Sequence, residues 1–438
     1  MRRIVQRGGR TGFVVSACVL AGLIVAVARA ASGALDPSFG GDGKVQTDFG
    51  SPAIAEGVSS PRDKKLDVAG HSADGNFAVA RYLVDGKPST NFGGDGTVST
   101  DFDGRIDAAY AITYAINAGK AVTVAVGSSH PVGDDEASDF ALAQYAGNGA
   151  LVKHFDHDGR LLTDFGDSDD EAYGVGIQKD GKIVVAGVTD EGTGKDFALA
   201  RYKEQDGILD PRFGTGGKVV TDLGSNEDVG RAMAIREAGS KILVVGSTLA
   251  GGGGSNFALA RYDQFGALDP NFGTGGIVIT DFGGDDVAYS VVFQPNGQAV
   301  VAGESTVGGR LQYALARYTF SGALDPNFGT GGKVLTAFDG TTADSARGVG
   351  ISKDGRIVAG GWSEKASPAG DVDFSLARYM TDGTLDPAHG TGGMVLTDFA
   401  GNSSDRAHAI HVRLDGVALA AGETSAPGGS FAVARYTK

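Results

Sequence analysis

The sequence predicts an all-β protein: a seven-bladed β-propeller with four antiparallel strands per blade, closed by an N-terminal strand that completes the C-terminal blade. Three observations support this prediction. A segment that reads FALARY, or a close variant, occurs seven times, and a segment that reads TDF, or a variant, also occurs seven times. The array begins with the pattern of a fourth strand and ends with that of a third strand, so the two ends together would form one complete blade. The FALARY segments begin at Phe77, Phe140, Phe197, Phe257, Tyr313, Phe374 and Phe431.

One repeat illustrates the four predicted strands, which we expect at residues 173–178, 182–186, 197–202 and 218–223. Asp180-Gly181 between the first two segments is typical of a tight hairpin turn. The FALARY segment is apolar or amphipathic on both alternating faces, which indicates a strand that is covered on both sides. Four-stranded sheets stacked face to face around an axis provide such cover.

The ends of the array predict how it closes. The repeats open at residues 35–49 with LDPSFGGDGKVQTDF, which has the pattern of a fourth strand and its loop, and they end at residues 431–436 with a third strand. We therefore expect residues 44–49 to complete the blade formed by residues 407–436. A β-solenoid or another closed repeat array is the alternative, although an open solenoid would be expected to carry polar caps.

The first 30 residues have the pattern of a secretory signal peptide. Four arginines precede an apolar run over residues 12–27, which ends in Ala28-Arg29-Ala30. We expect cleavage near Ala30, an exported propeller domain over residues 31–438, and no transmembrane span in the mature chain. Two alternatives remain: acylation of Cys18, because residues 15–18 resemble a lipobox, and retention of the segment as an uncleaved anchor.

Composition narrows the classes of function. Cys18 is the only cysteine, so the predicted mature chain has no disulfide, no thiolate metal site and no cysteine nucleophile. It carries 33 basic and 53 acidic residues, a net charge of −20. This charge argues against nucleic acid or anionic lipid as a partner and favours cations. The 72 glycines recur periodically, which indicates turns rather than a flexible linker.

Four linked motifs, DGKIVVAG, FALARY, LDPNFGTGG and TDFG, make the chain resemble the delta-60 repeat family of exported bacterial proteins. The resemblance covers essentially all of residues 33–438. It implies an exported array of β-repeats and brings no catalytic residues and no agreed ligand. The chain departs from the pattern at residues 59–65, 88–92 and 151–159.

The connections between strands sort onto two faces of the predicted propeller. One face carries the DG turns and LDPNFGTGG loops, which are nearly identical in each repeat and indicate architecture. The other carries variable loops and many acids, and variable loops on a rigid scaffold usually hold binding sites. The candidate ligand-binding residues on this face are Asp170, Glu171, Asp228, Asp286, Asp344, Asp405 and Trp362.

Two interpretations of these acids remain open. A ring of carboxylates near the axis would hold Ca²⁺ or a cationic ligand, because hard cations require several converging oxygens. Alternatively, an Asp ahead of each first strand accepts backbone hydrogen bonds in a turn and is otherwise solvated. Trp362, the only tryptophan, is expected to open a variable loop, where an exposed ring would suit sugar or peptide stacking.

Other candidates are weaker. The arginine of FALARY recurs in six of the seven copies, and we expect it to form a structural ion pair with a repeated aspartate, such as that of LDP. His408 and His411 lie three apart on a predicted strand and would point to opposite faces. His154 and His157 lie in a degraded loop. No GxSxG, HExxH or phosphate-binding glycine loop occurs, so no catalytic residue is assigned.

These observations favour a non-enzymatic, secreted or cell-surface propeller that acts as a monomer and binds an extracellular protein, a glycan or a cation through its variable face. Ca²⁺ is the one cofactor that the acids suggest. The alternative is a hydrolase or lyase that uses carboxylates at the axial mouth of the propeller. Closely spaced carboxylates in a pocket, one of them with a raised pKa, would favour the enzyme.

Overall fold

The computed structural model describes residues 32–438 except 61–64, 118–119, 134–136, 167–168, 191–193, 237–239, 250–253, 369, 402 and 427–429. The predicted signal segment, residues 1–30, lies outside the described residues. Within the described part every regular element is a β-strand, so the predicted all-β class is confirmed. No helix in this part is long and apolar enough to cross a membrane.

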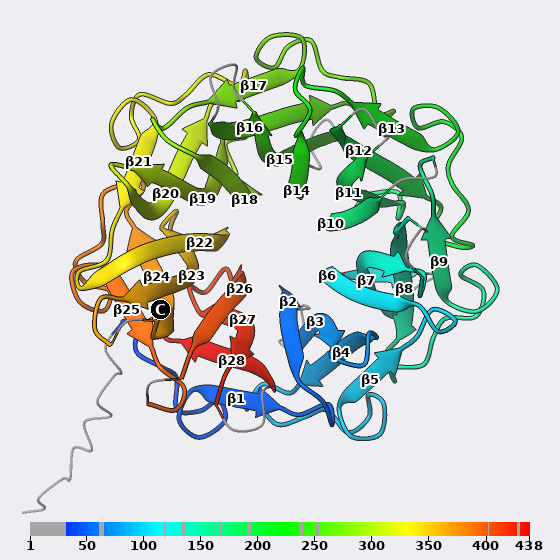
Figure 1. Cartoon of the computed structure of the whole chain (residues 1–438), viewed down its shortest axis with the longest axis horizontal. Coiled ribbons are helices and arrows are strands. Elements are labelled where there is room, and N and C mark those ends of the chain that lie inside the picture. Colours follow the sequence, from blue (N-terminus) through cyan, green and yellow to red (C-terminus); the bar gives the residue numbers. More distant parts are fainter. Residues whose placement is uncertain are drawn as a thin grey trace, which may run out of the picture. The chain divides into compact units, whose positions relative to one another are not determined.

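The strands form four-stranded antiparallel sheets that lie around one axis (Figure 1). Each sheet follows the chain outward from its innermost strand, except that the outermost strand beside β28 (Ser430–Tyr436) is β1 (Lys44–Thr47). Two sheets are joined into an eight-stranded assembly by a single parallel bridge between Leu311 and Ala343. The innermost strands are β2 (Ala53–Ser59), β6 (Ile106–Asn117), β10 (Asp170–Ile177), β14 (Val229–Arg236), β18 (Asp286–Phe293), β22 (Thr341–Ile351) and β26 (Asp405–Val412).

The second, third and outermost strands follow in the same order around the axis. The second strands are β3 (Leu66–Ser72), β7 (Lys120–His130), β11 (Ile183–Asp190), β15 (Lys241–Leu249), β19 (Ala299–Val307), β23 (Ile357–Lys365) and β27 (Ala418–Thr424). The third strands are β4 (Phe77–Tyr82), β8 (Asp139–Ala146), β12 (Lys195–Tyr202), β16 (Ser255–Tyr262), β20 (Arg310–Tyr318), β24 (Val372–Tyr379) and β28 (Ser430–Tyr436). The outermost strands are β5 (Thr97–Thr100), β9 (Arg160–Thr163), β13 (Lys218–Thr221), β17 (Ile277–Thr280), β21 (Lys333–Thr336), β25 (Met394–Thr397) and β1 (Lys44–Thr47).

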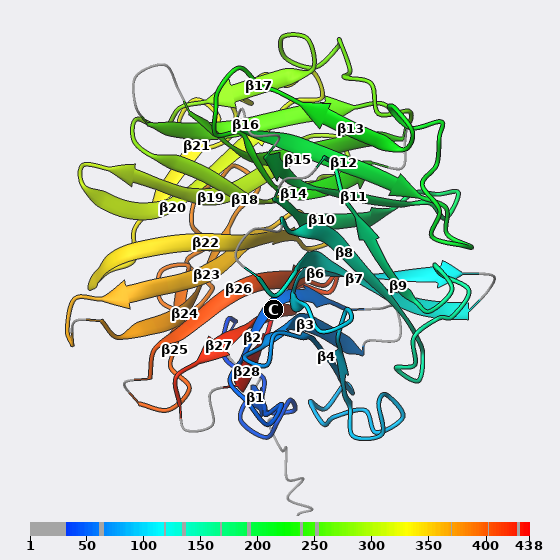
Figure 2. The same ribbon diagram turned by 45° about the vertical axis from the view of Figure 1, so that its right-hand side comes forward.

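Strand β1 joins the sheet formed by the end of the chain. It pairs antiparallel with β28, in the register Lys44 to Ala434 through Thr47 to Phe431, and both views place the two strands side by side (Figures 1 and 2). Phe39 and Val433 lie in one apolar cluster with Val68 and Tyr82 of the first complete sheet. The two ends of the repeat array therefore share both backbone hydrogen bonds and a core.

The predicted strands exist, but the second and third are longer than expected. A loop was expected over residues 188–196. Instead, β11 continues to Asp190 and β12 begins at Lys195. The reason is that the two strands continue to pair, up to the pair Asp190–Lys195. The variable connections on this face are therefore shorter than the sequence pattern suggested.

Neighbouring sheets are packed through residues that repeat. The third strands are buried on both faces, as their two apolar sides predicted. The hydroxyl of the last tyrosine in each third strand forms a hydrogen bond of 2.6–3.0 Å with a threonine hydroxyl of a neighbouring outermost strand. The pairs are Tyr82–Thr47, Tyr145–Thr100, Tyr202–Thr163, Tyr262–Thr221, Tyr318–Thr280, Tyr379–Thr336 and Tyr436–Thr397.

The repeated arginine of the third strand forms a buried ion pair. In five sheets its partner is the LDP aspartate, at 2.8–3.0 Å, as expected: Arg201–Asp210, Arg261–Asp269, Arg317–Asp325, Arg378–Asp386 and Arg435–Asp36. In the remaining case Ser89 replaces that aspartate, and Arg81 pairs instead with Asp67 at 2.6 Å. Each guanidinium is therefore neutralised within its own sheet. Arg81 also donates to the carbonyl oxygen of Gly147 in the next sheet, at 2.8 Å.

Removing one partner of this ion pair should destabilise the protein strongly. Arg261 is 1% exposed, so Asp269→Ala leaves a buried charge without its carboxylate, and we expect a loss of about 3–5 kcal/mol in the free energy of unfolding. Urea denaturation measures it. Lys241→Ala is the matched control: it removes the second, more exposed cation on Asp269 and should cost less than about 1 kcal/mol. Equal, small losses for both variants would show that the buried pair is not structural.

Candidate functional site

Every innermost strand contains a β-bulge at the same point. In β10 the pairing with β11 jumps from Ala172 to Gly174, so that Tyr173 is an extra residue. A bulge bends its strand and changes the direction of a side chain. The extra residues of the seven innermost strands, which we call the bulge ring, are Glu56, Tyr110, Tyr173, Arg231, Tyr289, Arg347 and His408.

Small residues flank each member of the bulge ring, because the innermost strands lie very close together. A Cβ atom added to Gly348 of β22 would lie 2.7 Å from the backbone nitrogen of Ile410 in β26. One added to Gly57 of β2 would lie 3.0 Å from the Cα of Ala111 in β6. Real Cβ atoms do not approach backbone atoms so closely, so larger residues would push the strands apart. The flanking positions are accordingly Ala, Gly or Ser in every innermost strand.

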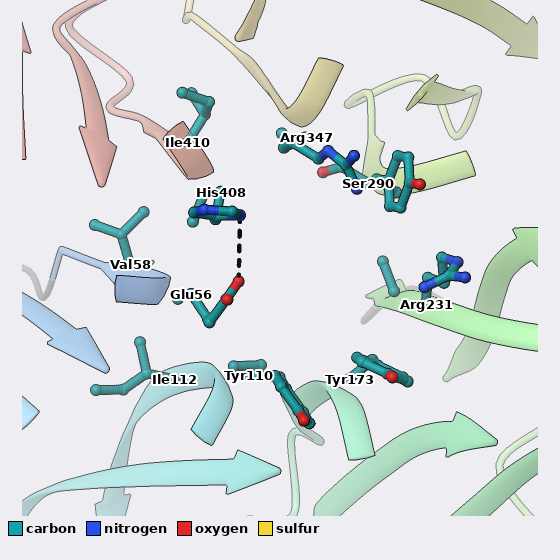
Figure 3. A pocket seen from close by; sticks show the side chains of 16 residues that line it. Glu56, Val58, Tyr110, Ile112, Tyr173, Arg231, Ser290, Arg347, His408 and Ile410 are labelled. Atoms are coloured by element: carbon teal, nitrogen blue, oxygen red, sulfur yellow. Dashed lines mark ion pairs between the residues drawn. The ribbon is translucent and has the colours of Figure 1, made fainter. Parts of the chain in front are cut away.

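The bulge ring lines an axial cavity of about 410 Å³ (Figure 3). All seven members contribute to its wall, together with small residues and the apolar side chains of Val58, Ile112 and Ile410 from the same strands. Figure 3 shows Glu56, Tyr110, Tyr173, Arg231, Arg347 and His408 around one central space. This volume lies within the range of about 300–1,000 Å³ that is usual for small-molecule sites.

His408 lies between two carboxylates. Its Nδ1 atom is 3.5 Å from Oε2 of Glu56, and its Nε2 atom is 3.7 Å from Oε1 of Glu423 in β27. Hydrogen bonding and the charge of His408 lower the pKa of Glu423, although burial opposes the shift. Glu423 is therefore ionised at neutral pH. About a fifth of the His408 side chain is exposed, so a ligand in the cavity can reach it.

His71, in β3, lies behind this group. Burial lowers the pKa of His71, although the charge of Glu56 opposes the shift, so its imidazole is neutral at physiological pH. Its Nδ1 atom is buried and has no hydrogen-bond partner among the described residues. We assign no role to His71 beyond its place next to the carboxylates.

Tyrosines form a second part of the wall. The rings of Tyr110 and Tyr173 are stacked, with 4.9 Å between centroids and 30° between planes. The Tyr173 hydroxyl donates to Glu171, and the Tyr289 hydroxyl donates to Glu304 at 3.0 Å. Burial raises the pKa of all three tyrosines, so their hydroxyls keep their protons at neutral pH.

Two arginines of the bulge ring lie against these rings. The Arg347 guanidinium is 3.8 Å from the centroid of Tyr289 and 3.4 Å from the Glu304 carboxylate. The Arg231 guanidinium lies between Tyr173 and Tyr289, at 5.9 and 5.3 Å from the ring centroids. The cavity therefore presents cations, proton-bearing hydroxyls and an imidazole to the same space.

The structure places five of the predicted site residues elsewhere. Asp170, Asp228, Asp286, Asp344 and Asp405 are fully buried, and each accepts a hydrogen bond of 2.6–3.1 Å from the backbone N–H that follows the TDF aspartate position. They do not line the axial cavity. This geometry matches the alternative interpretation of a local backbone acceptor, except that the carboxylates are buried rather than solvated.

The other two predicted residues lie close to the bulge ring. Glu171 accepts the hydrogen bond from Tyr173. Trp362 lies within β23 instead of opening a loop, because it is paired with Ser345 of β22 on one side and with Phe374 of β24 on the other. Its ring is 5.9 Å from the Arg347 guanidinium and 5.8 Å from that of Arg406. It therefore supports the cavity wall from behind.

The bulge ring was not predicted from the sequence. His408 and His411 were expected on opposite faces of a strand, and only His408, the extra residue of the bulge, lines the cavity. The missed signal is a single large polar residue between two small ones, once in every repeat. The type of this residue varies from repeat to repeat, whereas its neighbours stay small.

Three sets of aspartates bear on the Ca²⁺ expectation. Asp139–Asp164–Asp170, Asp196–Asp222–Asp228 and Asp373–Asp398–Asp405 each bring three carboxylates within 4.8 Å of one another. Burial raises the pKa of Asp170 to about 6. Protein cations already contact two sets: Arg105 lies 2.6 Å from Asp139, and Lys365 lies 2.8 Å from Asp373. Ca²⁺ binding at these sets stays a prediction.

Calcium titration followed by thermal melting tests that prediction. Millimolar Ca²⁺ should raise the melting temperature of the native protein, because a bound divalent cation would offset the repulsion between clustered carboxylates. The control replaces one ligand in each set, in Asp139→Asn, Asp196→Asn and Asp373→Asn, the residue type that two other sheets carry at Asn76 and Asn256. A melting temperature that Ca²⁺ does not change would remove the cation hypothesis.

Comparison with known proteins supports the propeller architecture. A family model described as a domain of unknown function (DUF5122) beta-propeller matches residues 178–213, 240–272, 294–328 and 353–388. Each match runs from the first hairpin of a repeat to the LDPxF loop. The prediction of β-propeller repeats is therefore confirmed. No curated protein sequence matches the chain.

Solved structures with similar folds include Sqt1 from Chaetomium thermophilum, with 13% identity, 90% of this chain and 91% of that chain covered, and a TM-score of 0.48. The polysaccharide lyase Uly1 has 10% identity, with 87% and 89% of the two chains covered and a TM-score of 0.44. The Trypanosoma rangeli sialidase in complex with sialic acid has 10% identity, with 74% and 53% covered and a TM-score of 0.43.

These comparisons correct the expected function. Several of the similar structures are named as enzymes, among them a lyase, a sialidase, an arabinanase and a GH74 enzyme. The expectation of a non-enzymatic binding module is therefore not supported, and the alternative of a hydrolase or lyase agrees better with these names. At these identities and TM-scores the likeness concerns the fold, so the chemistry has to be argued from the axial cavity itself.

Proposed function

We propose that the chain is a glycan-cleaving enzyme of the lyase class whose active site is the axial cavity. The observation that carries the proposal is the bulge ring, which brings His408, flanked by Glu56 and Glu423, into a cavity that also holds tyrosines and arginines. Pockets in which titratable groups converge are the usual places for catalysis.

His408 is suited to transfer protons. Histidine is the side chain whose unperturbed pKa lies in the physiological range, so it can both accept and return a proton. The carboxylates of Glu56 and Glu423 lie 3.5 and 3.7 Å from the two ring nitrogens of His408 and orient the ring toward the cavity. The lowered pKa of Glu423 keeps that carboxylate charged while His408 acts.

Carboxylates alone support the hydrolase alternative less well. Most glycoside hydrolases need one carboxylic acid with a raised pKa to protonate the leaving oxygen. Glu423, which lies 3.7 Å behind His408, has a lowered pKa, so it is not such an acid. His408, with Glu56 and Glu423 as its charge partners, is the better proton acceptor, which favours a lyase.

The tyrosines are suited to hold a sugar. Flat aromatic surfaces pack against the apolar face of a sugar ring, and the stacked rings of Tyr110 and Tyr173 are partly accessible from the cavity. Their partners Ser128 and Glu171 limit how far the hydroxyls can turn. A substrate would therefore meet a wall whose side chains are already oriented.

Replacing His408 should abolish most of the activity. The native protein is assayed against a panel of polysaccharides for new unsaturated ends, which absorb ultraviolet light, and for new reducing ends. His408→Gln should lower kcat about 10²- to 10⁴-fold on any cleaved substrate, because general base catalysis is lost. His411→Gln, three residues along β26 and outside the cavity lining, is the matched control and should keep native activity. Cleavage that survives His408→Gln, or no cleavage of any acidic or neutral glycan by native protein, would contradict the proposal.

We further propose that the array is a seven-bladed propeller of delta-60 repeats, closed by β1 and exported as a monomer. Closure is supported by the pairing of β1 with β28 and by the Tyr82–Thr47 hydrogen bond. A monomer is supported because the first strand completes a sheet of its own chain. Export is supported by the basic and apolar pattern of residues 1–30.

Removal of the closing strand should destabilise the protein. Deleting residues 31–49 in addition to the signal segment removes Phe39, Val45 and the β1–β28 hydrogen bonds, and should cost several kcal/mol, at roughly 1.5–3 kcal/mol for each large buried side chain. Thermal melting against the protein that starts at Ala31 measures it. Identical melting of the two proteins would contradict closure by β1.

A further inference from the structure

Arg231 differs from the other arginine of the bulge ring. Arg347 is balanced by Glu304 at 3.4 Å, whereas no carboxylate lies within ion-pair distance of Arg231 in the described part of the chain. The Nε atom of Arg231 is buried and has no hydrogen-bond partner there. A partly buried guanidinium without an anion is costly, and it gains most from a negatively charged ligand.

The neighbours of Arg231 cannot supply that anion. Tyr173 and Tyr289 flank the guanidinium, but their hydroxyls are bound to Glu171 and Glu304, and their raised pKa values keep them neutral. Glu304 already accepts from Tyr289 and, at 2.5 Å, from Ser345. The bulge fixes the backbone of Arg231 at the cavity wall, so the guanidinium stays exposed to the central space.

We propose that Arg231 binds the carboxylate of an acidic sugar, so that the substrate of the axial site is a carboxylated glycan. This inference rests on the proposed function and names its substrate class. The planar guanidinium suits a carboxylate, to which it can donate two parallel hydrogen bonds. The stacked tyrosines lie next to it and provide the surface for the sugar ring.

The surrounding charges favour a carboxylate over a phosphate. Glu56, Glu171, Glu304 and Glu423 all lie at or behind the cavity wall, so a doubly charged group would be repelled more strongly than a singly charged one. A carboxylate paired with Arg231 also makes the proton on the adjacent carbon easier to remove. His408 is the base that the same cavity offers for it. The electron pair of the C–H bond then forms a C=C bond, the C–O bond to the neighbouring sugar breaks, and the leaving oxygen takes a proton, which protonated His408 can return.

Binding to a catalytically silent protein tests this inference separately from catalysis. Calorimetry on His408→Gln uses three probes: tetragalacturonate, its methyl ester, which has the same chain without the charge, and sialyllactose, which carries its carboxylate on a terminal sugar. We expect at least one of the two acidic probes to bind. If tetragalacturonate, whose carboxylates lie along the chain, is the probe that binds, its methyl ester should bind about 10- to 100-fold more weakly.

The Arg231→Gln substitution, made in the same background, should weaken binding of the acidic probe about 10- to 100-fold and leave binding of the ester unchanged. Arg236→Gln is the matched control, because Arg236 lies in the same strand, stacks on Phe320 and does not line the cavity. No binding of either acidic probe, equal affinity for acid and ester, or unchanged affinity in Arg231→Gln would overturn the inference. A failed cleavage assay would leave these binding results intact, so the two failures are distinguishable.

Discussion

The close approach of the innermost strands is the constraint on which the site depends. Where a Cβ atom would meet the backbone of the next strand at 2.7 Å, as at Gly348, only small residues fit. The residues on either side of each bulge are accordingly small. The bulge adds one residue to each innermost strand and turns the side chain of that residue toward the axis, while the residues that face the next strand stay small. Crowding and bulges together create a cavity with seven independently variable side chains.

The outer part of each sheet is packed in nearly the same way around the axis. The Tyr–Thr hydrogen bonds join third strands to neighbouring outermost strands, and the buried Arg–Asp pairs join third strands to the LDP loops. Their repetition also explains why Asp67 replaces the missing LDP partner of Arg81: the buried guanidinium requires a carboxylate, and the sheet provides one from a different strand. The scaffold is thus uniform, and the seven positions at its axis are free to differ.

The sequence predicted the scaffold well and the site poorly, for physical reasons. Strand order, the ion pairs of Arg201 and Arg261 and the pairing of residues 44–47 with the last strand follow from repeated hydrophobic and charged patterns. The bulge residue differs in type from repeat to repeat, so repeated patterns did not identify His408 as a residue of the axial cavity. The repeated Asp ahead of the first strand suggested a ligand, yet Asp286 is a buried acceptor for the N–H of Phe282. Trp362 was expected in a loop because the pairing of β23 beyond Gly361 could not be inferred from the sequence.

The most direct test of the central claim is a crystal structure of the His408→Gln protein with a bound acidic oligosaccharide. If the bulge ring is the active site, the sugar lies in the axial cavity, with its carboxylate against the Arg231 guanidinium and a ring packed on Tyr110 or Tyr173. A ligand found only among the connections on the outer surface, with an axial cavity that contains water alone, would contradict the account.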